Sequence, residues 1–112
     1  MSNPVISSDK VEGTSVYNAA GDKLGSIDDL MIDKRSGLVR YAVLEFGGFL
    51  GIGTDRYPVP WALLKYDTDK DGYVVPLDAR QLEKAPHYPP ANAPSYTDDY
   101  GRNVYDYYRV GW

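Results

Sequence analysis

The amino-acid sequence predicts an all-β domain that ends in a short helix and an extended aromatic tail. Two segments rich in β-branched and aromatic residues, 23–33 and 38–46, flank a turn in which Gly37 supplies the positive φ of a tight hairpin. A further extended segment with two prolines follows at 57–61, and an acidic turn at 67–72 separates two more apolar segments.

Length and composition limit the number of domains and the class of partner. A chain of 112 residues has room for one hydrophobic core, and 43% hydrophobic with 25% charged residues is ordinary for a globular protein. The net charge of −4 opposes attraction to nucleic-acid phosphates and to anionic lipids. Cysteine is absent, which excludes disulfides and thiolate metal sites. Nucleic acid is therefore not a favoured partner.

Residues 1–10 are polar and are expected to form an N-terminal lead-in to the domain. They lack the basic start and the apolar run of a secretory signal, and no apolar segment approaches the ~20 residues that span a bilayer. We therefore expect a cytoplasmic protein without direct membrane insertion.

A first strand is expected at 11–17. The two predicted strands that follow it have unusual hydrophobic patterns. Within 23–33, Ile27 and Leu30 would lie on opposite faces of a flat strand, so either both faces are partly covered or an extra residue forms a bulge. A bulge would bend the strand, as barrel closure requires. The strand at 38–46 is apolar on both faces, and its second face needs cover from a loop, helix, tail or second subunit.

Proline and turn residues place the next strands. Pro58 and Pro60 lack a ladder donor, so the segment 57–61 is expected at a sheet edge or at the start of a strand. The apolar segments 63–66 and 73–75 flank the acidic turn and are expected to form a final hairpin.

Capping residues predict the short helix at 76–86. Asp78 can accept a hydrogen bond from the backbone N–H of Gln81, whose side chain reaches back to form a capping box. Leu77 and Leu82 have the spacing of a hydrophobic staple, and a proline ends the helix.

Residues 87–112 form a Tyr- and Pro-rich extension that contains six of the eleven tyrosines. Its prolines favour extended backbone, and its tyrosines offer the stiff amphipathic surface that is enriched at interfaces. We therefore expect the tail to dock, on its own domain or on a neighbouring subunit, and to bury at least Tyr107 or Tyr108. A neighbouring subunit is favoured, because an extended segment reaches it without a sharp reversal.

Three short motifs resemble those of the PRC-barrel family. They are Gly-Asp-Lys-Leu-Gly at 21–25, Arg-Tyr-Ala-Val at 40–43 before Gly-Gly-Phe-Leu-Gly at 47–51, and Val-Pro-Trp at 59–61. The resemblance covers a domain at 11–86 and implies a small β-barrel of about six strands. Family members act as docking domains, for example in the photosynthetic reaction-centre H subunit and in a ribosome-maturation factor. The resemblance therefore implies a docking role.

The sequence offers no convincing catalytic, cofactor or metal site. The acidic turn 67–72 matches the opening of a calcium loop, but Asp78 is too short for the twelfth position and strand-like residues precede the turn, so a plain hairpin turn is favoured. The Gly-rich segment 48–53 lacks the spacing and the following helix of a phosphate-binding loop. His87 is the only histidine and is expected to be solvated or stacked. We therefore expect a protein without enzyme activity, cofactor or metal.

The expected function is a non-catalytic protein-interaction module that forms a homodimer or a larger homo-oligomer. The candidate interaction residues lie in the Gly-rich loop and at the end of the tail: Phe49, Leu50, Ile52, Tyr105, Tyr107, Tyr108 and Trp112. The loop residues have an alternative role, which is to cover the mouth of the barrel. The alternative function is an RNA- or ribosome-associated maturation factor, which the acidic net charge disfavours.

Overall fold

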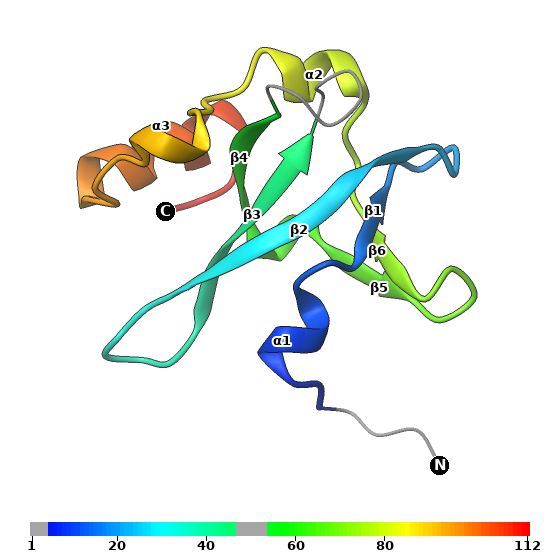
Figure 1. Cartoon of the computed structure of the whole chain (residues 1–112). Coiled ribbons are helices and arrows are strands. Elements are labelled where there is room, and N and C mark those ends of the chain that lie inside the picture. Colours follow the sequence, from blue (N-terminus) through cyan, green and yellow to red (C-terminus); the bar gives the residue numbers. More distant parts are fainter. Residues whose placement is uncertain (1–4, 47–53) are drawn as a thin grey trace.

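The protein is built on one twisted sheet with short helices around it (Figure 1). The computed structural model describes residues 5–46 and 54–112. The six strands stand in the order β4-β3-β2-β1-β6-β5. β1 and β6 pair in parallel, and the other neighbours pair antiparallel. The strand bounds are Ser15–Tyr17 (β1), Lys23–Ile32 (β2), Val39–Phe46 (β3), Asp55–Pro60 (β4), Lys65–Asp67 (β5) and Gly72–Val74 (β6).

The predicted fold class is confirmed in its six-stranded sheet, but "all-β" is too narrow a description. Three α-helices, α1 (Ser8–Val11), α2 (Ala79–Glu83) and α3 (Asp98–Tyr107), occur within the described ranges. In the same part of the chain no ladder joins β4 to β5, so the sheet is open rather than a closed barrel. Pro58 and Pro60 have no backbone N–H to donate on this edge of β4. The edge pairs instead at Arg56, whose backbone forms an isolated bridge with Tyr88.

The predicted bulge in β2 is present. Ile27 pairs with Leu44, whereas Asp29 pairs with Val43, so one extra residue stands in β2 between these two pairs. Because of this shift, Ile27 and Leu30 both pack on the main core. The bulge therefore resolves the change of phase in the hydrophobic pattern.

The two apolar faces of β3 are covered by different parts of the molecule. Ala42 and Leu44 are fully buried in the main core, between the strands and α2. Tyr41, on the opposite face, packs against the C-terminal tail. The tail of the same chain thus provides the cover that the strand pattern required.

The first strand is shorter than predicted. Residues 8–11 form α1, and β1 starts only at Ser15. The chain turns between them at Gly13, whose φ of +87° is accessible to glycine and whose N–H donates to the Ile27 carbonyl at 2.6 Å. Val11, which we expected to start the strand, instead ends the helix with its side chain in the core.

The segment after β4 follows the prediction closely. A 3₁₀ turn, Trp61–Leu63, leads into the predicted hairpin of β5 and β6. The capping box of α2 is present: Asp78 accepts from the N–H of Gln81 at 2.7 Å, and the Gln81 side chain accepts from the Asp78 N–H at 2.9 Å. Leu82 is fully buried in the main core, so α2 closes that core.

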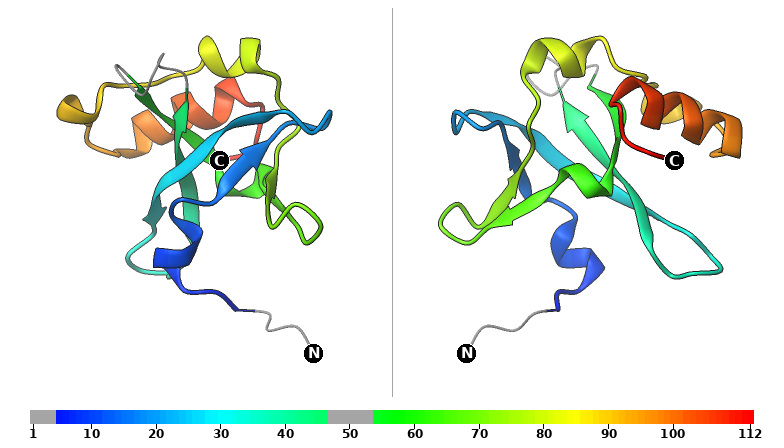
Figure 2. Two further views of the ribbon diagram at one scale, coloured as in Figure 1. Left: turned by 45° about the vertical axis from the view of Figure 1, so that its right-hand side comes forward. Right: turned by 180° about the vertical axis from the view of Figure 1, so that it is seen from behind.

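The expectation of an extended tail was wrong, because residues 98–107 form helix α3. Prolines stop at Pro94, so they do not restrict the helix, although a short 3₁₀ turn, Pro90–Asn92, precedes it. Thr97 caps α3 by accepting from the N–H of Tyr100 at 3.2 Å, and acidic residues occupy its first turn. Figure 2 shows α3 beside β4 on the outer side of the sheet.

Candidate interaction surface

The tail forms an aromatic layer over the outer face of β3. Its centre contains Tyr41 from the strand, with Val104 and Tyr105 from α3, all three buried. The Tyr41 ring meets the rings of Tyr96 and Tyr105 edge to face, at centroid distances of 5.3 and 5.5 Å. Such pairs add about 0.5–1.5 kcal/mol each beyond the burial of their area.

Hydroxyl groups fix the tail to two separate parts of the domain. The Tyr105 hydroxyl donates to the Arg40 carbonyl of β3 at 2.8 Å, and the Tyr107 hydroxyl donates to the Gln81 carbonyl of α2 at 2.5 Å. The tail therefore docks in cis, on its own domain.

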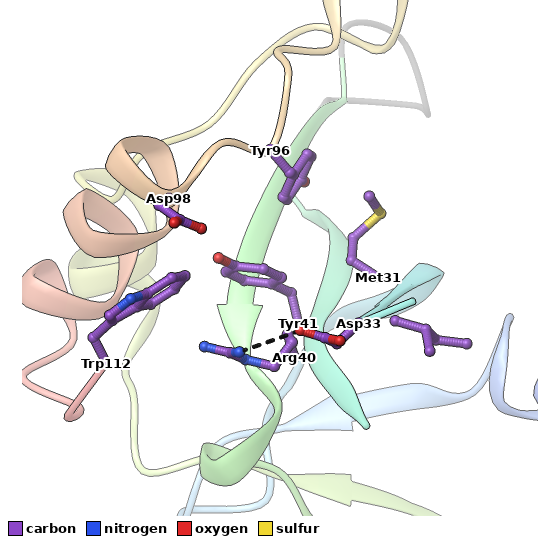
Figure 3. Close-up of a pocket in the computed structure, with 8 residues that line it drawn as sticks. Met31, Asp33, Arg40, Tyr41, Tyr96, Asp98 and Trp112 are labelled. Atoms are coloured by element: carbon purple, nitrogen blue, oxygen red, sulfur yellow. Dashed lines mark ion pairs between the residues drawn. The ribbon is translucent and has the colours of Figure 1, made fainter. Parts of the chain in front are cut away.

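A groove of about 150 Å³ opens between this tail and the hairpin that joins β2 to β3 (Figure 3). We call it the C-terminal groove. Its walls come from β2 and the turn after it, β3, the segment before α3, the first residue of α3 and the last residue of the chain: Met31, Ile32, Asp33, Arg40, Tyr41, Tyr96, Asp98 and Trp112.

A cation–aromatic contact occupies one side of the C-terminal groove. The Arg40 guanidinium lies 4.5 Å from the centre of the Trp112 ring and 3.8 Å from the Asp33 carboxylate. Backbone N–H groups of Ser36 and Arg35 hold the pKa of Asp33 below its usual range, so this carboxylate is charged at neutral pH. Asp98, the first residue of α3, also lines the groove on the same side as Trp112, and among the described residues it forms no ion pair (Figure 3). The groove thus carries one more negative charge than positive charge.

The tyrosine hydroxyls of the layer are unsuited to acid–base chemistry at neutral pH. Burial raises the pKa of Tyr41, and burial together with the hydrogen bond between the Tyr96 and Tyr88 hydroxyls raises that of Tyr96. Burial also raises the pKa of Tyr100 to about 12. All three hydroxyls therefore stay protonated, and the layer offers packing and recognition rather than a general base.

A second groove lies on the other side of Tyr96, with a volume of about 330 Å³. Its cation, Arg56, is 3.1 Å from the carboxylate of Asp28, and its guanidinium also donates to the Thr54 carbonyl at 3.2 Å. A further carboxylate on its lining, Asp29, forms no ion pair among the described residues and accepts a hydrogen bond from the Leu30 N–H at 2.8 Å.

The structure divides the predicted interaction residues. Tyr105 is buried at 6% exposure and Tyr108 is half-buried, so both belong to the docked layer. Tyr107 and Trp112 keep exposed fractions of 39% and 46% and remain accessible. The burial predicted for Tyr107 or Tyr108 is met in part by Tyr108. The three loop candidates lie outside the described residues: Phe49, Leu50 and Ile52.

Sequence reasoning missed the β2–β3 hairpin as part of the surface. Ile32 and Leu38 flank its turn and are 51% and 64% exposed. Their position on either side of Lys34 and Arg35 was the available signal, since apolar residues beside a charged turn have little to pack against.

The acidic turn and His87 have structural partners. The segment that enters the turn is strand β5, and the Asp67 carboxylate accepts from the N–H groups of Asp69 and Lys70 at 2.9 and 3.2 Å. The Asp71 carboxylate accepts from the Tyr66 hydroxyl. His87 stacks on Tyr57 with ring centres 4.8 Å apart, in line with the stacked alternative.

Comparison with known proteins identifies the fold family but no curated relative. Within the described residues, no helix is long and apolar enough to cross a membrane. No curated protein matches the sequence. A profile of the PRC-barrel domain matches residues 4–82, which include all six strands and most of α2. The match ends before the aromatic tail. The chain therefore belongs to the PRC-barrel domain family.

Proposed function

We propose that this PRC-barrel chain is a non-catalytic protein-interaction module that associates with itself in the cytoplasm. The observation that carries the proposal is the group of exposed apolar side chains at the C-terminal groove. Ile32 and Trp112 line the groove with exposed fractions of 51% and 46%, and Leu38, at 64%, lies on the same hairpin as Ile32. Apolar groups gathered in this way are typical of a surface that is covered in a complex.

The apolar contacts alone are too weak to hold two copies together. Full burial of a large apolar side chain is worth about 1.5–3 kcal/mol, and these three are already about half buried, so covering them gains roughly 2–4 kcal/mol in total. Association costs an estimated 4–15 kcal/mol in lost freedom of motion. Polar and charged contacts must therefore contribute to the interface.

The charge of the surface disfavours the RNA-associated alternative. Asp33 and Asp98 line the groove with one cation, Arg40, and the whole chain has a net charge of −4. A nucleic-acid phosphate would meet repulsion both at long range and in the groove.

Sedimentation velocity at increasing protein concentration tests the proposal. We expect the wild-type chain to sediment as a species heavier than the monomer, and Ile32→Ser to shift it towards the monomer. Ile6→Ser is the matched control, because Ile6 is 52% exposed but lies in the N-terminal segment. A wild-type chain that stays monomeric throughout would refute self-association.

A further inference from the structure

The tip of the β2–β3 hairpin is a preformed basic projection. The Asp33 carboxylate accepts from the N–H groups of Arg35 and Ser36 at 2.8 and 2.9 Å, and the Asp33 N–H donates to the Leu38 carbonyl at 2.8 Å. Lys34 and Arg35 are exposed at this fixed turn, and neither forms an ion pair within the described part of the chain. Figures 1 and 2 show the hairpin extending away from the body of the domain.

The C-terminal groove has the complementary character. Aromatic faces and carboxylates together are the surroundings that proteins use to hold Lys and Arg side chains. Arg40 already demonstrates this within the chain, since it lies between the Trp112 ring and the Asp33 carboxylate. Asp98, which also lines the groove, has no cation paired with it among the described residues, whereas its neighbour Asp99 pairs with Arg102 at 3.5 Å.

We propose that the C-terminal groove is a binding site for basic side chains, and that its occupant is the hairpin tip of a second copy of this chain. This inference rests on the proposed self-association and assigns its contacts. Lys34 and Arg35 of one copy approach Asp98 and the Trp112 ring of the other.

A second copy fits better than an unrelated basic partner because the chain carries both halves of the contact. Ile32 and Asp33, where β2 enters the turn of the hairpin, line the groove. Two hairpins that lie side by side in opposite directions therefore bring each tip to the groove of the other copy, which is a closed two-fold arrangement. The same arrangement covers the exposed side chains of Ile32 and Leu38, whose burial supplies the apolar part of the interface.

Exchange of charges between the tip and the groove tests this contact. The tip variant is Lys34→Glu with Arg35→Glu, and the groove variant is Asp98→Lys. Each variant alone places like charges at both copies of the contact, so we expect its dimer to dissociate about tenfold or more readily than the wild type. When the two variants are mixed, every contact in the mixed dimer again joins opposite charges, so native mass spectrometry should show the mixed dimer in preference to either homodimer.

Asp99→Lys is the matched control for the groove variant. It changes the same charge in the same first turn of α3, but the Asp99 side chain is 94% exposed and does not line the groove. We expect this variant to dimerise as the wild type does, and thermal melting verifies that each variant is folded.

The outcomes separate this inference from the proposed function. A wild type that self-associates while the charge exchange changes nothing, or while Asp99→Lys acts as strongly as Asp98→Lys, overturns only the assigned contact. A wild type that is monomeric at all concentrations overturns both. Preferential formation of the mixed dimer supports both.

Discussion

Close packing between α3 and the sheet makes Gly101 a sensitive test of the docked tail. A Cβ built at Gly101 would overlap the Tyr41 hydroxyl and the ring of Trp112. The exposed Trp112 ring is free to move, so it would give up its edge-to-face contact with Tyr105 at 5.2 Å and its contact with Arg40 at 4.5 Å. These contacts are worth about 0.5–1.5 and about 0.5–1 kcal/mol.

Helix propensity acts in the opposite direction. Replacing glycine by alanine inside a helix gains about 1 kcal/mol, which offsets part of the loss. The buried Tyr41 ring must also shift, so we expect Gly101→Ala to lower the free energy of unfolding by roughly 1 kcal/mol. Asn103→Ala is the control, since this exposed position on the same helix should gain up to about 0.7 kcal/mol without any clash.

Urea titration and tryptophan fluorescence measure the two effects of Gly101→Ala. The Trp61→Phe background isolates the emission of Trp112, which should move to longer wavelength as the ring enters water. If Gly101→Ala instead stabilises the protein as much as Asn103→Ala and leaves the emission unchanged, the close contact of α3 with the sheet is wrong.

Three further predictions concern the cap, the acidic turn and the tyrosines. Asp78→Ala should lower the free energy of unfolding in urea by about 1 kcal/mol, and Asp78→Asn by less; equal stability would remove the capping role. Calcium should leave the melting temperature unchanged, because the carboxylates of Asp67 and Asp71 already accept hydrogen bonds within the hairpin; saturable stabilisation lost in Asp69→Ala would contradict this. Burial raises the pKa of Tyr100 from 10.0 to about 12. The contribution of the protonated Tyr100 hydroxyl to the free energy of unfolding is therefore complete below pH 10 and is lost as the pH rises towards 12. The melting temperature of Tyr100→Phe should fall less steeply with rising pH in this range than that of the wild type. An identical dependence of the two melting temperatures on pH would contradict the role of burial.

Local sequence signals predicted the sheet and α2 well because their causes are local. The mismatch of Ile27 with Leu30 indicated the bulge in β2, and the Asp78–Gln81 pair marked the start of α2. The two apolar faces of β3 also correctly indicated a cover on each side. These features depend on neighbouring residues and on simple periodicity.

The tail and the surface were harder to predict because competing signals had to be weighed. The prolines at 89, 90 and 94 favour extended backbone only where they stand, and Thr97 with two acidic residues gives a helix start beyond them. The C-terminal groove combines residues from β2, β3 and the tail, and sequence spacing carries no sign that Asp98 and Arg40 line the same groove. Such a site depends on tertiary packing.

The docked tail has a consequence for how the protein is made. All six strands end by Val74. The hydroxyl that donates to the Arg40 carbonyl belongs to Tyr105, which follows Arg40 by 65 residues. During translation the sheet precedes its cover, and contacts of such long sequence separation form slowly. For that interval the apolar face of β3, including Tyr41 and Val43, is bare on a nascent chain. Chaperones and neighbouring nascent copies therefore have access to a surface that the finished protein no longer shows.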